Sequence, residues 1–333
     1  MHPIDVHIRR DSIDDVLARL ESESPADKPP QLIRVEHSYL YSVAELVKCR
    51  YPSAPIVVNA HNVETRLKES VAASYQSSVA RRWEFAHADL VREIELRMLR
   101  HTAAAYCCSD SDVSIYRRIA EESGQSMNCR LFNIPNGVDT RWFTAADPTG
   151  NEKCLLFTGT AGYRPNDEAV RLLTQQIWPE LRDLAPGIRL IIAGRNAKQC
   201  WSAYVRNDDS IELHSDVPDM RVLMRRACVS LVPLRSGSGT RLKIVEAMSM
   251  RIPVVSTTIG AEGLNLTNNE EILIAESAVD FRDAVSRLIN DPEFARQISE
   301  NAHRRAVADY DWLTLERRLR ESFLALLAQI LPN

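Results

Sequence analysis

Short apolar runs alternate with helical stretches along most of this chain. In the first half, the apolar runs lie at residues 32–36, 56–59, 103–108 and 130–134. In the second half, they lie at residues 154–158, 190–193, 211–214, 229–234, 254–256 and 272–274. Strands that alternate with helices predict an α/β protein with parallel, doubly wound sheets. The loops that follow such strands meet at one edge of the sheet, where ligands bind.

Helical periodicity fills most of the segments between these runs. The longest helix is predicted at residues 78–101, where one face repeats at spacings of three and four through Trp83, His87, Leu90, Ile94 and Met98. One shorter helix is predicted at residues 12–21, a second ends near residue 50, and a third follows the N-cap candidates Ser109 and Asp110. Further helices are predicted at residues 166–182, 220–226, 242–250 and 278–288. Residues 311–331 form a last helix, whose apolar face alone predicts a cap on the second domain.

Two domains and a final helix are expected. The segment Asp-Pro-Thr-Gly-Asn at residues 147–151 is the best linker, so the domains are predicted at residues 1–147 and 148–310, followed by a helix at 311–333. A length of 333 residues suits two domains of ordinary size. A hydrophobic content of 45% and a charged content of 26% are typical of a soluble globular protein.

Charge, hydropathy and cysteine usage exclude several classes of function. A formal net charge of −4 argues against nucleic acid as a partner. The chain contains no apolar run long enough to span a membrane, and its start lacks the apolar core of a secretory signal. The seven cysteines are odd in number and form no Cys-x-x-Cys pair, which argues against a zinc site and fits a reducing cytoplasm. No cofactor is expected.

The strongest candidate site follows the apolar run at residues 229–234. Gly237 and Gly239 can adopt positive φ and let a ligand approach the backbone. A helix is expected to begin near Thr240, where free N–H groups and the helix dipole favour a phosphate.

Charged residues follow this loop at helical spacing. Arg241 and Lys243 carry positive charge in the first turn, which is the wrong sign for the helix dipole unless an anion binds there. Glu246 lies about one and a half turns further on, where its carboxylate could accept bonds from ribose hydroxyls. Glycine and cations alone fit equally well a structural turn with solvated basic residues.

The whole string from Gly239 to Met248 is more specific than its parts. It reads Gly-Thr-Arg-Leu-Lys-Ile-Val-Glu-Ala-Met and resembles the donor-binding motif of family-4 retaining glycosyltransferases, in the subgroup with Gly-Thr-Arg-Leu-Lys-Ile-Leu-Glu-Ala-Met. The resemblance implies a GT-B fold, in which two Rossmann-like domains face a cleft. Two positions depart from it: many relatives carry a glutamate in place of Ser238, near the donor sugar, and a glycine in place of Arg251.

Other segments extend the resemblance. Residues 157–166 look like the first strand and loop of the donor domain, with Gly159 and Gly162 where the donor approaches. Residues 190–195 look like its next turn, which places Arg195 at the mouth of the site. Residues 215–219 match the segment whose backbone reads the nucleotide base, around Val217. After Tyr-Asp-Trp at residues 310–312, the last helix of the family crosses back onto the first domain.

His61 is the candidate catalytic residue of the first half. It begins the segment His-Asn-Val-Glu at residues 61–64, which recurs in the subgroup, as does Pro-Asn-Gly-Val-Asp at residues 135–139. In relatives a histidine on this loop lies across the cleft from the donor, near the reacting sugar. A lone histidine after a strand is more often structural, but the motif favours the functional interpretation.

The resemblance implies a metal-independent hexosyltransferase that uses a nucleotide-diphosphate sugar and a glycan or lipid-linked acceptor in polysaccharide biosynthesis. It implies a cytoplasmic protein, with peripheral contact at the inner face of the membrane as an option for the helix at residues 79–100. The family's first strand and its glycine-rich loop are expected to be missing, which predicts an incomplete N-terminal domain and a sheet edge open to a partner chain. The alternatives are a non-catalytic relative that binds a nucleotide or a partner and, less favoured, a sugar-nucleotide epimerase.

Overall fold

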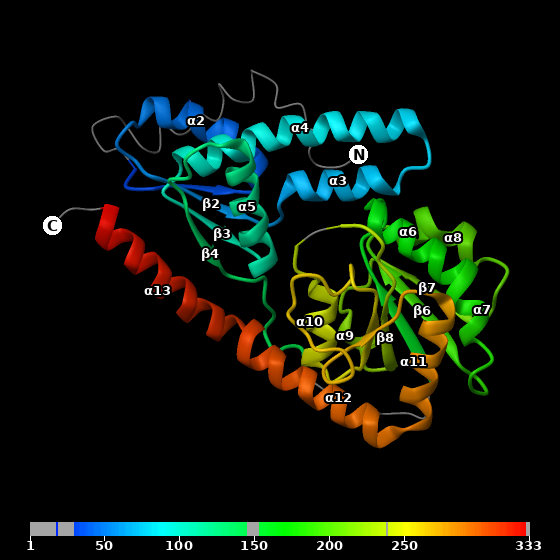
Figure 1. The fold of residues 1–333 in the computed structure, drawn as a ribbon. Helices are drawn as coiled ribbons and strands as arrows, with labels where there is room; N and C mark the ends of the chain where they lie inside the picture. The colour runs from blue at the N-terminus through cyan, green and yellow to red at the C-terminus, as the bar shows by residue number, and fades with distance from the viewer. Residues whose placement is uncertain (1–17, 19–29, 145–152, 238, 331–333) are drawn as a thin grey trace. The chain divides into compact units, whose positions relative to one another are not determined.

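The chain divides into two compact units (Figure 1). The computed structural model describes residues 18, 30–144, 153–237 and 239–330. The first unit contains the chain up to Pro135 and the segment from Arg318 onwards, and the second contains Asn136–Arg317. Each unit is built on one parallel sheet, which confirms the predicted α/β class. The linker predicted at residues 147–151 lies outside the described residues, as does the helix predicted at 12–21 apart from Ala18.

The first unit has a four-stranded sheet in the order β1-β2-β3-β4. Its strands are β1 (Ile33–Glu36), β2 (Ile56–Ala60), β3 (Ala104–Cys107) and β4 (Arg130–Asn133). Its helices are η2 (Ser38–Leu40), α2 (Tyr41–Arg50), α3 (Glu64–Ser74), α4 (Ser78–His101) and α5 (Asp110–Ser123). Helix α3 was not predicted, because most of its buried positions hold polar residues such as Glu64, Thr65 and Lys68.

The predicted apolar face of α4 was wrong at two positions. Met98 is buried, but the side chains of Trp83 and Leu90 are 65% and 66% exposed. The buried face instead passes through Ala88, Val91, Glu95, Leu96, Met98 and Leu99. Because this face contains small residues and a carboxylate, its periodicity is weaker in the sequence than that of the large exposed side chains.

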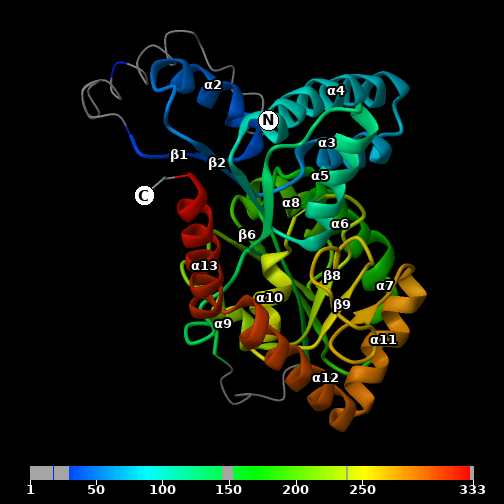
Figure 2. The same ribbon diagram turned by 60° about the vertical axis from the view of Figure 1, so that its left-hand side comes forward.

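The two faces of the first sheet pack against different helices. Ile56 and Val58 point into the cluster that includes residues of α2, α4 and α5. Val57 and Tyr106 point to the other face, where they pack with Leu326 of α13 (Trp312–Ile330). The C-terminal helix, drawn in red in Figures 1 and 2, therefore contributes residues to the core of the first unit.

The second unit has a six-stranded sheet in the order β10-β9-β8-β5-β6-β7, with every pair parallel. Its strands are β5 (Cys154–Thr158), β6 (Arg189–Gly194), β7 (Ile211–Ser215), β8 (Ala227–Val232), β9 (Val254–Ser256) and β10 (Leu273–Ile274). Its helices are α6 (Arg164–Leu172), η3 (Leu173–Ile177), α7 (Trp178–Leu181), α8 (Ala197–Val205), α9 (Arg221–Met224), α10 (Leu242–Ser249), α11 (Ala278–Asn290), α12 (Pro292–Arg305) and η4 (Ala306–Tyr310). Helices α6 and α8 pack together, and α10 packs on α12.

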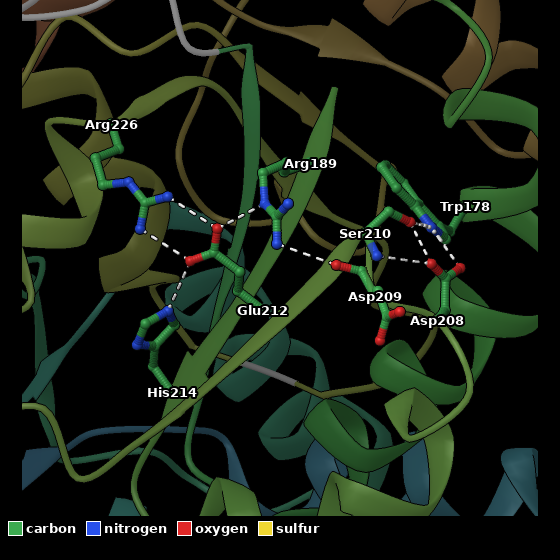
Figure 3. Close-up of polar contacts among 8 residues, drawn as sticks. All are labelled: Trp178, Arg189, Asp208, Asp209, Ser210, Glu212, His214 and Arg226. Atoms are coloured by element: carbon green, nitrogen blue, oxygen red, sulfur yellow. Dashed lines mark hydrogen bonds and ion pairs between the residues drawn. The ribbon is translucent and has the colours of Figure 1, made fainter. Parts of the chain in front are cut away.

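A network of ion pairs ties the edge strand β7 to β6 and to Arg226, which precedes β8 (Figure 3). Glu212 accepts two hydrogen bonds of 2.9 Å from Arg226 and one of 2.8 Å from Arg189, and it lies 3.1 Å from the His214 ring nitrogen. These bonds, those of Arg226 foremost, lower the pKa of Glu212 to about 2. Glu212 and Arg189, which lie at the centre of this network, are near the amino ends of their strands, whereas ligands are expected at the carboxyl ends.

Arg251 stands in the turn between α10 and β9 with a φ of 56°. A side chain in the left-handed region is strained, which explains the glycine expected there by resemblance. We predict that Arg251→Gly raises the free energy of unfolding by about 1 kcal/mol, measured by urea denaturation. Arg251→Ala removes the same charge near His303 but keeps a Cβ atom, so it should give no gain. An equal gain in both variants would assign the effect to charge.

None of the helices that the structure describes is long and apolar enough to cross a membrane.

Candidate functional site

A cavity of about 480 Å³ opens in the second unit at the carboxyl ends of β5, β6 and β8. Several residues predicted to bind the donor line it, namely Gly159, Arg195, Thr240, Arg241, Lys243 and Glu246. Others do not line it, namely Gly162, Val217, Gly237 and Gly239, while Ser238 lies outside the described residues. The local order of strand, glycine loop and helix therefore brings Arg241, Lys243 and Glu246 to one cavity, and Arg195 reaches it from the loop after β6.

The glycine loop adopts the backbone that its sequence predicts. Gly237 and Gly239 have φ values of 120° and 77°, which L-residues with side chains rarely adopt. A Cβ atom on Gly237 would lie 3.0 Å from Nη2 of Arg241. Helix α10 begins at Leu242, which agrees with the helix predicted at residues 242–250 and is two residues after Thr240, so Arg241 occupies its N-cap position. The loop thus requires glycine for its conformation and for the close approach of the guanidinium.

Arg241 and Lys243 place two cations beside each other. Arg241 is only 8% exposed, and its Nη1 donates a 2.7 Å hydrogen bond to the carbonyl of Gly239. The Lys243 ammonium lies 4.4 Å from the centroid of the Phe157 ring. Desolvation and then the charge of Arg241 lower the pKa of Lys243 to about 7, although Glu246 acts in the opposite direction. The pocket therefore holds positive charge that an anion would stabilise.

Glu246 lies further along α10 and completes the charged lining. Desolvation raises its pKa, and the charge of Lys243 opposes this shift. A carboxyl group that lines a cavity between apolar residues can accept hydrogen bonds from hydroxyl groups of a ligand. The chemistry of this wall suits a polyol next to an anion.

Gly159, directly after β5, and Gly194, the last residue of β6, allow close packing. A Cβ atom on Gly194 would lie 1.6 Å from the carbonyl oxygen of Gly159, and one on Gly159 would lie 2.8 Å from Cγ of Asn166. Gly162 has a φ of +82° and open space around it. Asn166 also lines the pocket, although it was not among the predicted site residues. Its only signal in the sequence is its place at the end of residues 157–166, which resemble the first strand and loop of the donor domain.

The loops after β6 and β7 are tied together by Asp216. Its carboxylate accepts a 3.0 Å hydrogen bond from the backbone N–H of Asn196, and both residues have φ values near +60°, at 56° and 58°. Val217 is partly buried and packs against the apolar core. The reading of a base by the backbone near Val217 stays a prediction.

In the first unit, His61 lies at the carboxyl ends of β1 and β2. Its Nε2 is 3.0 Å from the Glu36 carboxylate, which also accepts a 2.8 Å hydrogen bond from Asn59. Its ring centroid is 4.3 Å from that of His37. The His61 side chain is 31% exposed, so the ring is held in place and still reachable.

A carboxylate that was not among the predicted site residues anchors the loop after His61. Glu95 of α4 is fully buried and accepts hydrogen bonds of 2.8 and 3.2 Å from the backbone N–H groups of Glu64 and Thr65, where α3 begins. It also accepts from the hydroxyls of Ser38, Thr65 and Tyr116 at 3.0, 2.6 and 3.0 Å. A carboxylate at a helix N-terminus interacts favourably with the helix dipole. Glu95 therefore fixes the start of α3.

The match to a family model lies within the second unit. The family model described as Glycosyl transferases group 1 matches residues 152–291. The glycogen synthase of Mycobacterium tuberculosis is 26% identical over 246 residues, which are 71% of this chain and 57% of that protein. A 44.6 kDa protein in the cps region of Klebsiella pneumoniae is 25% identical over 164 residues, 47% of this chain and 42% of that protein. The chain thus spans about half the length of these relatives.

Solved structures resemble nearly the whole chain. Sucrose-phosphate synthase from Thermosynechococcus elongatus gives a TM-score of 0.72 at 18% identity and covers 96% of this chain and 78% of that one. Anabaena HepE in complex with UDP and glucose gives 0.68 at 14% identity and covers 97% and 84%. At identities of 18% and 14%, structural similarity establishes the fold alone. Residues 152–291 therefore match the Glycosyl transferases group 1 model, and the chain has the α/β fold of GT-B glycosyltransferase structures with both Rossmann-like domains present.

Proposed function

We propose that this protein is a retaining glycosyltransferase that moves a hexosyl group from a nucleotide-diphosphate sugar to a hydroxyl acceptor. The observation that carries the proposal is the pocket of the second unit, in which Arg241, Lys243 and Glu246 line one cavity beside the glycine loop. Two cations and the start of a helix suit a diphosphate. The carboxyl group of Glu246 suits the ribose hydroxyls.

Under this proposal, the charged residues of the pocket and His61 have separate roles. Arg241 and Lys243 stabilise the negative charge that develops on the leaving diphosphate, which a metal ion would otherwise do. The reaction is therefore proposed to need no metal. His61, held by Glu36 and still reachable, is proposed to contact the reacting sugar or the acceptor. The acceptor is proposed to be a glycan or lipid-linked intermediate of polysaccharide synthesis.

Uridine nucleotides are the first donors to test, because the HepE structures contain UDP and UDP-glucose. We predict that one of the three diphosphates UDP, GDP and ADP, at saturating concentration, raises the melting temperature of the protein by about 5 °C, since a ligand that binds only the folded state stabilises it. The thermal shift is measured with each diphosphate and its common sugar conjugates. No shift with any of them would contradict the proposal.

Transfer is tested with the conjugate that gives the shift. Release of the diphosphate in the presence of EDTA and an oligosaccharide or lipid-linked acceptor supports metal-independent transfer, and the anomeric configuration of the product, measured by NMR, tests retention. Binding without turnover over a broad set of acceptors supports the alternative of a non-catalytic nucleotide-binding relative, which Ser238 in place of a glutamate favours.

A further inference from the structure

We propose that Asn166 is a positioning residue for the diphosphate: its side-chain amide holds the Lys243 ammonium against the loop that follows β5. The inference rests on the proposed function of the pocket. It adds a residue that the motif from Gly239 to Met248 does not contain, and that residue lies on a different helix, α6.

Both ends of the Asn166 amide are engaged. Oδ1 accepts a 3.0 Å hydrogen bond from Nζ of Lys243, and Nδ2 donates a 3.0 Å hydrogen bond to the carbonyl oxygen of Thr160. An ammonium can only donate and a carbonyl can only accept, so these two partners allow one orientation of the amide. The loop after β5 and the cation on α10 are therefore linked through a single side chain.

The packing around Asn166 leaves the amide little freedom. The side chain is 7% exposed, and a Cβ atom on Gly159 would lie 2.8 Å from its Cγ. The backbone N–H of Asn166 donates a 2.9 Å hydrogen bond to the carbonyl of Tyr163 at the start of α6. Since the amide is held on several sides, the ammonium is in place before a ligand arrives, which reduces the entropic cost of binding.

The Asn166 amide holds the Lys243 ammonium in a different way from a carboxylate. The carbonyl oxygen of Asn166 accepts a hydrogen bond from the ammonium without neutralising it, so the positive charge remains available to an anion. The pKa of Lys243 is about 7, lowered by desolvation and by Arg241 and opposed by Glu246. Arg195 and Tyr163 also face the cavity. The other ionisable groups of α6 are the ion pair of Arg164 with Glu168, Arg171, and Asp167, whose carboxylate accepts hydrogen bonds from the Gly162 N–H and from Trp201. A bound anion raises the pKa of Lys243, so binding takes up a proton near neutral pH.

This arrangement gives the affinity for UDP a pH dependence whose sign is fixed. Affinity decreases as the pH rises through the pKa of Lys243 in the free protein, about 7, because the neutral amine must first be protonated. The phosphate groups of UDP also titrate near pH 6. Their contribution is the same for every variant, so differences between variants report on the protein.

The test measures the affinity for UDP by calorimetry from pH 5.5 to 9 in the wild type and in Asn166→Asp, Asn166→Leu and Asn166→Ser. We predict that Asn166→Leu and Asn166→Ser lower the affinity for UDP about 10-fold at pH 7, since the ammonium loses its acceptor. In both variants the pH at which the affinity falls should be lower than in the wild type. Asn166→Asp supplies a negative charge, so the pH at which the affinity falls should be higher by about one unit. The exposed Asn207→Ser is the matched control and should change neither quantity.

Each outcome decides one of the two proposals. The serine side chain is smaller than that of asparagine and cannot overpack the site. If the leucine or aspartate variant does not fold properly, Asn166→Ser still tests the role of Asn166. A pH profile and an affinity for UDP that are unchanged in Asn166→Ser would overturn the role of Asn166 alone. A wild-type protein that binds none of UDP, GDP or ADP at any pH would overturn the proposed function together with this inference.

Discussion

Replacing Lys243 by methionine is expected to lower the affinity for UDP about 100-fold, which corresponds to about 2.7 kcal/mol, while the protein stays at least as stable. The ammonium donates to Asn166 and lies over the Phe157 ring, so its removal deletes a charge aimed at the pocket. Methionine keeps the length and apolar character of the side chain. Because desolvation already disfavours the charged form of Lys243, its removal should not destabilise the fold.

Calorimetry at pH 6.5 and thermal unfolding without ligand separate the two effects. The matched control is Lys153→Met, which removes an exposed lysine just before β5, at the end of the strand opposite to the pocket. This control should bind UDP with wild-type affinity. A Lys243→Met protein that unfolds at a much lower temperature but keeps its affinity for UDP would show that Lys243 is structural.

The strands of the second unit were predictable because the sheet is covered on both faces. In such a sheet the central strands bury side chains on both faces, so Cys154–Thr158 and Val254–Ser256 appear as mainly apolar runs with clear ends. Helices that bury few apolar side chains leave no such signal. Helix α12, whose buried positions are Ile298, Ser299 and Ala302, was missed for this reason.

Spacing along the chain predicts the candidate site only where it is local in the sequence, and Gly159 and Arg195, which line the same pocket, were expected there by resemblance. Arg241, Lys243 and Glu246 lie on one loop and one helix, so their spacing alone places them together. The contact of Asn166 with Lys243 depends on β5 lying beside β8 in the sheet, which no local pattern encodes. The same holds for Glu95, whose partners at Ser38 and Thr65 come from other elements.

Glu95→Ala is expected to lower the free energy of unfolding of the first unit by about 3–5 kcal/mol. Alanine would leave the backbone N–H groups of Glu64 and Thr65 and the surrounding hydroxyls without their acceptor, in a place that is fully buried. Burial raises the pKa of Glu95 and the hydrogen bonds of Thr65 and Glu64 lower it, so these donors also stabilise the carboxylate that the apolar surroundings disfavour. The measurement is urea denaturation at pH 7 with hydrogen exchange of the amides at the start of α3.

Two variants and a second readout give this prediction its control. Glu93→Ala removes an exposed glutamate two residues away on the same helix and should cost less than about 0.5 kcal/mol. Glu95→Gln keeps one carbonyl oxygen but turns an NH₂ group toward the remaining donors, so its cost should be intermediate. UDP binds in the second unit under our proposal, so the Glu95→Ala protein should still bind UDP while the amides of α3 exchange faster. A cost below about 1 kcal/mol for Glu95→Ala would mean that water or the hydroxyls replace the carboxylate, and Glu95 would then not hold the loop that carries His61.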